Sequence, residues 1–389
     1  MTMTINNEHN KLNVPNLRFP EFQGEWKELG LSELLDFKNG LNPKPNKFGK
    51  GIKFISVMDI LNNAVITYDC IKASVDVTEK ELSDFSVEKG DILFQRSSET
   101  LEDVGRANVY MDDKTSVFGG FVIRGKKKGE YDPQYFNYLL RSPFARKRII
   151  PMGAGAQHFN IGQEGLSKVK LHFANIEEQK KIGNFLSLLD ERIATQNKII
   201  DKLQSLIKGI SSRIFTSIQG IEYRMGDIVT ITNGNSNVQD AVTQSKDGLY
   251  PFFDRSEDIK YLPTFLFDKE AIIYPGEGTE FMPRYFKGKF ALHQRCYAIF
   301  DFNEIINARF LYFYLKTRNS YFVKNAVGST VPSLRLDTFQ KLKVIIPPKK
   351  IQHSVSSCLS SMEQKCNVEK KILYKLLNQK QYLLRQMFI

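Results

Sequence analysis

The sequence predicts an α+β protein of two similar globular domains joined by two long helices, which form an antiparallel coiled coil with an internal pseudo-two-fold repeat. Three observations predict this fold: an internal repeat, a heptad pattern late in each copy, and short apolar runs typical of strands. The chain has 389 residues, of which 42% are hydrophobic and 25% charged. That length suits two domains of ordinary size.

The internal repeat is clearest toward the end of each half. Residues 155–215 align without a gap onto residues 328–388, which places Gln179 opposite Gln352. Two shorter matches pair YFNYLLRS (135–142) with FLYFYLKT (310–317), and LSELLDFKNG (31–40) with MGDIVTITNG (225–234). The chain is therefore two copies of one unit, with similar ends and divergent centres.

Short apolar runs bounded by glycine or aspartate predict strands in each globular domain. They are Lys53 to Ile60, Asp91 to Gln95, Phe121 to Arg124, Ala271 to Gly276, Cys296 to Phe300 and Leu342 to Ile346. A helix follows late in each domain. Asp132-Pro133 provides an N-cap and a first turn for a helix through Arg148, and Asn307 opens its counterpart.

Each copy ends in a long helix whose apolar residues alternate by four and three positions, which is a heptad pattern. We call these positions the seam. The first seam is Ile182, Leu186, Leu189, Ile193, Gln196, Ile200, Leu203, Ile207, Ile210 and Ile214, and the second is Val355, Leu359, Met362, Cys366, Glu369, Leu373, Leu376, Lys380, Leu383 and Met387. One such helix alone would be an amphipathic core helix. Two matched seams predict a coiled coil, with Gln196 and Glu369 as polar positions that fix the register.

The helix ends and the connections between elements complete the prediction. Asn175 followed by Glu178 resembles a capping box, and Pro347-Pro348 closes the strand before the second helix. Antiparallel pairing follows because the first helix leads directly into the second domain, which has to end near the start of the second helix. The predicted boundaries are a polar tail at 1–13, a first domain at 14–174, a helix at 175–215, a second domain at 216–346 and a helix at 347–389.

Composition and charge restrict the function. The formal net charge of +12 and a pI near 9.3 favour a polyanionic partner, although an unspecialised basic surface remains the alternative. No apolar run approaches the roughly 20 residues that cross a bilayer, and the polar N-terminus carries no signal peptide, so we expect a cytoplasmic protein without a membrane partner. Cys70, Cys296, Cys358 and Cys366 include no C-x-x-C pair and are expected to be free thiols.

Catalytic motifs are missing from the sequence. It contains no P-loop, no Asn-Pro-Pro-aromatic run for adenine methylation, no convincing carboxylate cluster, and only scattered histidines. We therefore predict no catalytic residue, no metal site and no cofactor in this chain. Runs such as Arg146-Lys147-Arg148 are explained by ordinary solvation, with phosphate contact as the alternative.

Polar loops provide candidate DNA-reading residues, because arginine pairs with guanine edges and glutamine or asparagine with adenine edges. The first domain offers Arg96, Ser97, Ser98, Arg106, Gln157, His158 and Asn160. The second domain offers Arg255, Arg284, Gln294, Arg295, Ser329, Thr330, Ser333 and Arg335. For any one of these residues a structural role is the simpler explanation, but the set as a whole suggests DNA reading.

NVPNLRFPEFQGEW (13–26) and LSKVKLHFANIEEQKKIGNFLSLLDERI (166–193), together with the repeat, resemble the specificity (S) subunit of type I restriction-modification systems. The resemblance covers nearly the whole chain. One departure is that Glu177-Glu178-Gln179 stands opposite Lys350-Ile351-Gln352, so only the glutamine is shared.

The resemblance implies two target recognition domains, each reading one half of an asymmetric bipartite site in double-stranded DNA. It also implies that two methyltransferase subunits dock on the helices and that restriction (translocase/endonuclease) subunits join the complex to cleave DNA. S-adenosylmethionine, ATP and Mg²⁺ would belong to those partner subunits. Two other readings stay open: a coiled-coil adaptor without sequence-specific DNA binding, and a self-contained DNA methyltransferase or nuclease.

Overall fold

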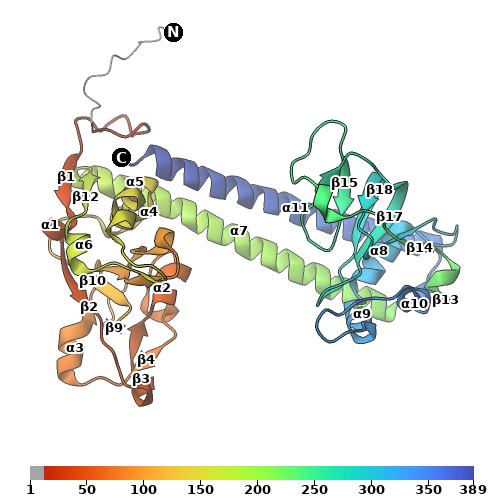
Figure 1. Ribbon diagram of the computed structural model, residues 1–389, viewed down its shortest axis with the longest axis horizontal. Coiled ribbons are helices and arrows are strands. Elements are labelled where there is room, and N and C mark those ends of the chain that lie inside the picture. The colour runs from red at the N-terminus through yellow and green to blue at the C-terminus, as the bar shows by residue number, and fades with distance from the viewer. Residues whose placement is uncertain (1–12) are drawn as a thin grey trace, which may run out of the picture. The chain divides into compact units, whose positions relative to one another are not determined.

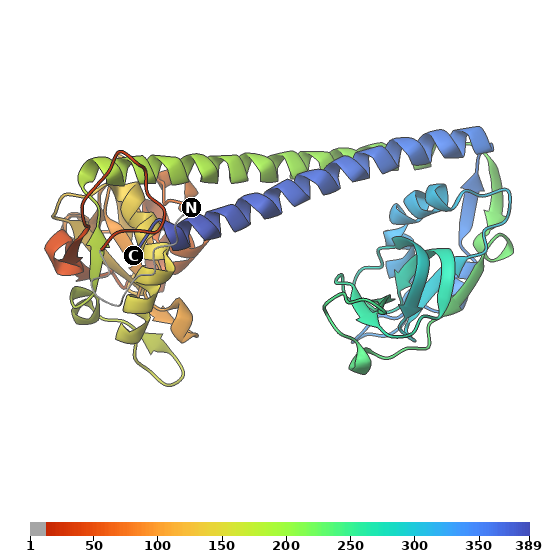
Figure 2. The ribbon, with the colours of Figure 1, turned by 90° about the horizontal axis from the view of Figure 1, so that it is seen from above.

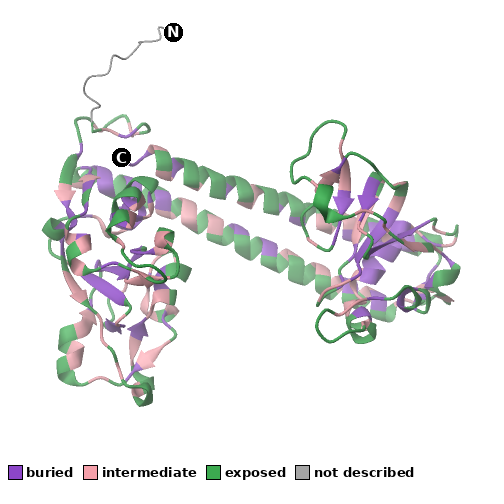
Figure 3. Ribbon diagram, viewed as in Figure 1, coloured by how far each residue is buried: buried purple, intermediate pink, exposed green. Residues whose placement is uncertain are grey.

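The computed structural model describes residues 13–389, so nearly all of the predicted polar tail at 1–13 lies outside the described residues. The chain divides into two compact units: unit 1 runs to Asn197 and includes Ile372–Ile389, and unit 2 is Lys198–Lys371. Each unit mixes helices and strands (Figure 1). In each unit the buried residues gather on the strands and on the helices that pack against them (Figure 3).

Unit 1 contains two four-stranded sheets, with strand orders β2-β10-β6-β8 and β4-β3-β9-β5, and two two-stranded pairs, β1-β12 and β11-β7. Its strands are β1 (Lys27–Gly30), β2 (Leu35–Asn39), β3 (Phe48–Ile55), β4 (Ser74–Val75), β5 (Ser86–Val87), β6 (Ile92–Gln95), β7 (Ser97–Ser98), β8 (Ala107–Val109), β9 (Ser116–Phe118), β10 (Val122–Lys127), β11 (Phe159–Asn160) and β12 (Lys170–Phe173). Its short helices are α1 (Leu31–Leu34), α2 (Val57–Asn62), α3 (Glu79–Phe85), α4 (Pro133–Arg141), α5 (Pro143–Ile149) and α6 (Gln163–Ser167).

Unit 2 contains a six-stranded sheet of order β14-β19-β17-β18-β15-β16 and the pair β13-β20. Its strands are β13 (Ile221–Arg224), β14 (Thr230–Asn233), β15 (Tyr250–Phe253), β16 (Lys260–Leu262), β17 (Phe267–Pro275), β18 (Arg284–Leu292), β19 (Cys296–Phe300) and β20 (Lys343–Ile346), and its short helices are α8 (Ala308–Lys316), α9 (Asn319–Asn325) and α10 (Leu336–Gln340). The order β14-β19-β17-β18 repeats β2-β10-β6-β8, and β13-β20 repeats β1-β12. The internal repeat is therefore confirmed in the topology.

The long helices α7 (Ile176–Ser217) and α11 (Lys349–Gln386) lie close to their predicted ranges. No seam position is exposed on either helix, as the heptad pattern predicted. In unit 1 the start of α7 packs with the end of α11, where Lys380 Nζ lies 2.5 Å from Asp190 Oδ1. In unit 2 the end of α7 shares a core with the start of α11. Within each unit the two helices run antiparallel (Figures 1 and 2).

Two predicted elements were wrong in part. The run from Lys53 to Ile60 is not one strand, because β3 ends at Ile55 and Asp59 Oδ2 accepts hydrogen bonds from Ser56 N (2.8 Å) and Ser56 Oγ (2.7 Å), which starts α2. The helix predicted through Arg148 breaks at Ser142, since Pro143 cannot continue α4 and instead occupies the first turn of α5.

The capping box predicted at Asn175 is only half formed. Asn175 Oδ1 accepts a hydrogen bond from Glu178 N at 2.9 Å, as expected of an N-cap. The Glu178 carboxylate does not return to the cap. It accepts two hydrogen bonds from Arg18, at 2.8 and 2.7 Å, and is completely buried. Because Arg18 binds the Glu178 carboxylate, this carboxylate does not form the second hydrogen bond of the capping box.

The glutamine shared by both copies docks each domain helix onto its long helix. Gln179 Oε1 accepts from Asp132 N at 3.0 Å, and its Nε2 donates to Ala174 O at 2.8 Å. Gln352 Oε1 accepts from Asn307 N at 2.7 Å, and its Nε2 donates to Pro347 O at 2.8 Å. Because Asp132 and Asn307 are the N-caps of α4 and α8, the same contact orients the same helix in both units.

Candidate nucleic-acid interface

In unit 1 the structure brings most of the predicted reading residues together at the short β7-β11 pair. Ser97 lies opposite Asn160, and Ser97 Oγ donates a hydrogen bond to Asn160 Oδ1. Arg96, which precedes β7, is half-buried and directs its guanidinium toward Gly120 O at 3.4 Å. This strand pair therefore fixes Arg96, Ser97, Ser98 and Asn160 in one place.

Two further unit 1 candidates, Gln157 and His158, lie on loop A, which we define as residues 153–160. Ala154 and Asn160 close this loop with two backbone hydrogen bonds of 2.9 and 2.8 Å. Gly155 has a φ of 142°, a backbone conformation that other residues rarely adopt. Gln157 and His158 are exposed on the loop, so their polar side chains are available to a partner.

Unit 2 builds the same closure in loop B, residues 326–333. Val327 and Ser333 exchange backbone hydrogen bonds of 2.9 and 2.8 Å, and Gly328 has a φ of 103°. The loop rests on the chain after β17, where Gly278 N donates to Pro332 O at 3.0 Å. Ser329, Thr330 and Arg335, all predicted reading residues, are exposed on the loop or just after it.

A polar cavity of about 310 Å³ lies in unit 2 and gathers three further candidates. Arg255, Gln294 and Arg295 line it together with His293 and Glu277. Arg295 Nη1 lies 2.6 Å from Glu277 Oε1, and the Glu277 backbone pairs with Ser333 of loop B. Burial lowers the pKa of His293, which favours a neutral imidazole in this cavity. The cavity and loop B thus belong to one polar surface.

Two predicted residues lie apart from these groups. The Arg284 guanidinium donates to the carbonyl oxygens of Asp254 (3.1 Å) and Ser256, so it braces the chain after β15. Arg106 pairs with Asp103 at 2.5 Å and lines a separate cavity with Arg141 and Arg146. DNA contact by the individual residues of either unit stays a prediction.

Sequence reasoning did not find Arg141 and assigned Arg146 only to a charged patch. Their positions in the cavity depend on the break between α4 and α5, which the sequence pattern predicted as one helix. Phe121 was also missed: its side chain is 68% exposed, and its carbonyl accepts from Arg96 N at 2.9 Å beside the β7-β11 pair. No sequence signal marks these contacts, because each joins segments far apart in the chain.

The described residues hold no group of three or more histidine, cysteine, aspartate or glutamate side chains suited to a metal ion. All four cysteines are free thiols, as predicted. Over residues 13–389, no helix is both long enough and apolar enough to cross a membrane.

Comparison with known proteins assigns both halves of the chain to one family model. The model described as the type I restriction modification DNA specificity domain matches residues 23–205 and 221–378. A protein of Methanocaldococcus jannaschii that carries the name of a type I restriction enzyme MjaX specificity subunit is 27% identical over 209 residues, which are 52% of this chain and 48% of that protein. The type I restriction enzyme EcoDI specificity subunit of Escherichia coli is 28% identical over 138 residues, 36% of this chain and 30% of that protein. The chain thus spans about half, or less, of the length of these relatives.

Solved structures extend the likeness to the fold of the whole chain. The S subunit of a type I restriction-modification system from M. genitalium is 19% identical, with a TM-score of 0.65, and the match covers 97% of this chain and 99% of that one. A chain from a structure of type I R-M complex assembly has a TM-score of 0.56 at 13% identity, covering 93% of this chain and 97% of that one. At these identities the likeness shows a shared fold.

Proposed function

The chain belongs to the family of type I restriction-modification DNA specificity domains, and from this membership we propose that it is the non-catalytic DNA sequence-specificity subunit of a type I restriction-modification complex. Each unit would read one half of an asymmetric, bipartite site in double-stranded DNA. The two copies of the family domain carry this proposal, because each provides one reading unit.

The two loops support an asymmetric site. Loops A and B share a closure by paired backbone hydrogen bonds and a glycine with positive φ. The gapless repeat places Gln157 opposite Thr330 and His158 opposite Val331, so the same scaffold carries different side chains. Two equivalent loops with different chemistry would favour different bases, since base edges are distinguished by their donors, acceptors and methyl groups.

The proposal includes partners that this chain would serve. Two methyltransferase subunits would dock on α7 and α11, and restriction subunits with translocase and endonuclease activity would complete the complex. S-adenosylmethionine, ATP and Mg²⁺ would be bound by those subunits, in a cytoplasmic assembly. The likeness to a chain from a structure of type I R-M complex assembly supports this assignment.

A single-molecule methylation map of genomic DNA tests the function. We compare the source cell, a deletion of this gene, and the deletion complemented with the wild-type gene. We expect adenine methylation at one gapped, asymmetric motif to disappear on deletion and to return on complementation. An identical map in all three cells would contradict the proposal and favour a coiled-coil adaptor. Methylation by the purified chain alone with S-adenosylmethionine would contradict its non-catalytic role.

A further inference from the structure

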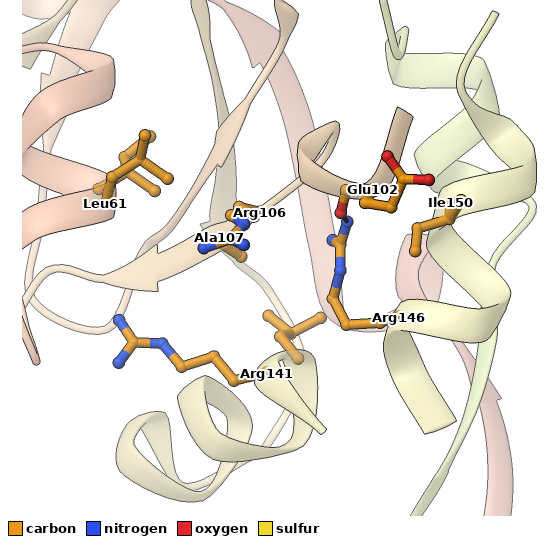
Figure 4. Close-up of a pocket in the computed structure, with 9 residues that line it drawn as sticks. Leu61, Glu102, Arg106, Ala107, Arg141, Arg146 and Ile150 are labelled. Carbon is orange, nitrogen blue, oxygen red and sulfur yellow. Dashed lines mark hydrogen bonds between the residues drawn. The ribbon is translucent and has the colours of Figure 1, made fainter. Parts of the chain in front are cut away.

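A group of arginines in unit 1 lies near the candidate reading residues. It is a cavity of about 400 Å³ lined by Arg106, Arg141 and Arg146, which we call the arginine cavity (Figure 4). Its other lining residues are Ile60, Leu61, Glu102, Ala107, Leu140 and Ile150, so polar and apolar groups share the wall.

Arg106 pairs with the Asp103 carboxylate at 2.5 Å, whereas Arg141 and Arg146 donate to uncharged backbone carbonyls. Arg141 Nη2 donates to Asn63 O at 3.2 Å, and Arg146 Nη2 donates to the carbonyls of Glu102 at 2.9 Å and Val104 at 2.6 Å. Figure 4 shows the Glu102 carboxylate turned away from the Arg146 guanidinium. Arg146 Nη1 is buried and has no hydrogen-bond partner among the described residues. Arg146 therefore brings a positive charge and one unused donor to the cavity.

The like charges also act on one another. Burial, and next the positive charge of Arg106, lower the pKa of Arg146 to about 10. Burial is also the main cause of the lowered pKa of Arg141; the charge of Asp190 opposes it, and Arg106 adds a smaller contribution that lowers the pKa. Burial thus disfavours the charged forms of Arg141 and Arg146, with Arg106 adding to the effect, and a bound anion would relieve that cost.

The arginine cavity is not required by the repeated fold. Lys316 occupies the position of Arg141 at the end of α8, and Glu363 neutralises it at 2.8 Å. The strand registers place Met282 at the position of Arg106. Arg106 and Arg141 therefore have no arginine counterparts in unit 2, which argues against a role in the shared fold.

Hydrogen bonds of Gln95 connect the backbone of Arg106 to that of Ser97 in the candidate interface. Gln95 N donates to Arg106 O at 2.7 Å, and Gln95 Nε2 donates to Ser97 O at 2.8 Å. One buried glutamine thus joins the arginine cavity to the strand pair that carries the predicted reading residues. In protein–DNA interfaces, phosphate contacts position the protein while neighbouring side chains read the bases.

We propose that the arginine cavity binds one phosphate group of the DNA backbone beside the half-site read by unit 1. The inference rests on the proposed function and changes the role of Arg106 from base reading to phosphate binding. Guanidinium forks match phosphate oxygens in geometry and charge, and three arginines line this cavity.

The test compares R106Q and R141Q with R148Q in the full-length chain. Arg148 is the matched control, because it lies on α5, is exposed and pairs with Glu28 at 3.6 Å outside the cavity. We measure the Kd for duplex DNA carrying the mapped motif at several KCl concentrations. R106Q and R141Q should each bind roughly tenfold more weakly at low salt. The slope of the logarithm of the association constant against log salt should become less negative by about one, because one phosphate contact is lost. R148Q should retain the wild-type slope, and equal slopes for R106Q and R148Q would overturn the proposal.

Backbone chemistry identifies the phosphate and its source. Neutral methylphosphonates are placed singly along the half-site; one position should weaken wild-type binding about tenfold and have no further effect on R106Q. If no position does so, while inorganic phosphate raises the Tm of the wild type but not of R106Q, the occupant is free phosphate and the DNA assignment is wrong. A failure of the proposed function would give a different result from a failure of the phosphate assignment. The wild-type chain itself would then show no preference for the mapped motif over other duplexes.

Discussion

At the scale of single residues, two glycines shape the surfaces that carry the candidate reading side chains. Gly155 has a φ of 142°, and a Cβ built there would lie 2.0 Å from His158 O. Gly328 has a φ of 103°, with the corresponding distance to Val331 O at 3.0 Å. Loop A therefore tolerates a side chain at its glycine less well than loop B, because a backbone oxygen cannot move aside without opening the loop.

We expect G155A to damage reading by unit 1 while the rest of the fold survives. The strain, about 1–3 kcal/mol, should open loop A and displace Gln157 and His158. Affinity for the mapped motif should fall by about tenfold or more, with little change in Tm. G162A is the control, since nothing lies within 4 Å of a Cβ at that position and its φ of −104° is ordinary. Wild-type affinity in G155A would contradict a role for loop A.

At the scale of elements, the orientation of α4 against α7 depends on one buried amide. The side-chain oxygen of Gln179 accepts a hydrogen bond from Asp132 N, and its side-chain nitrogen donates one to Ala174 O. The side chain is almost completely buried. Tyr138 adds a second contact by donating to Asp190 Oδ2 at 2.8 Å. Because α4 ends at Arg141, these contacts also set the position of the arginine cavity.

We expect Q179E to loosen α4 locally. The carboxylate replaces the donor that faces Ala174 O and leaves a charge buried, which costs about 2–4 kcal/mol. Hydrogen exchange should accelerate for the amides of α4 and remain unchanged for those of α8, whose own contact is made by Gln352. Q204E is the matched control on an exposed position of α7. Uniform acceleration across both units in Q179E would show that the contact is not local.

At the scale of the whole molecule, each unit has cores of its own. The largest core in unit 1 draws on its strands, on α4, on the start of α7 through Leu186 and on the end of α11 through Leu383. The largest core in unit 2 is formed in the same way, with Phe215 and Leu359. Since each unit buries its own apolar residues, its globular part should be exchangeable without loss of the other.

Exchange of residues 216–346 for the matching segment of a relative should change one half of the methylated motif and preserve the other. The physical reason is that the reading loops of unit 1, and the contacts that hold them, lie outside the exchanged segment. A methylation map of cells carrying the chimera measures both halves at once, with the wild-type map as reference. Changes in both halves would show that the two units do not read independently.

The predictions were correct where structure depends on residues close together in the sequence, and less so where it depends on residues far apart. The heptad seams and the repeat were read correctly, because periodic burial leaves its pattern in consecutive residues. The capping box at Asn175 was only half right, because Arg18, far away in sequence, captures the Glu178 carboxylate. The single helix predicted through Arg148 was wrong because Ser142-Pro143 restarts the helix.

The sequence by itself determined that the chain repeats, that each copy ends in a long amphipathic helix, and which family it resembles. Only the tertiary structure decided that Asn160 meets Ser97, that loops A and B share one closure, and that Arg106, Arg141 and Arg146 line one cavity. The reason is physical: periodicity and capping are local, so a linear pattern records them. Convergence of charged groups depends on how separate strands and helices pack, and no spacing along the chain encodes it.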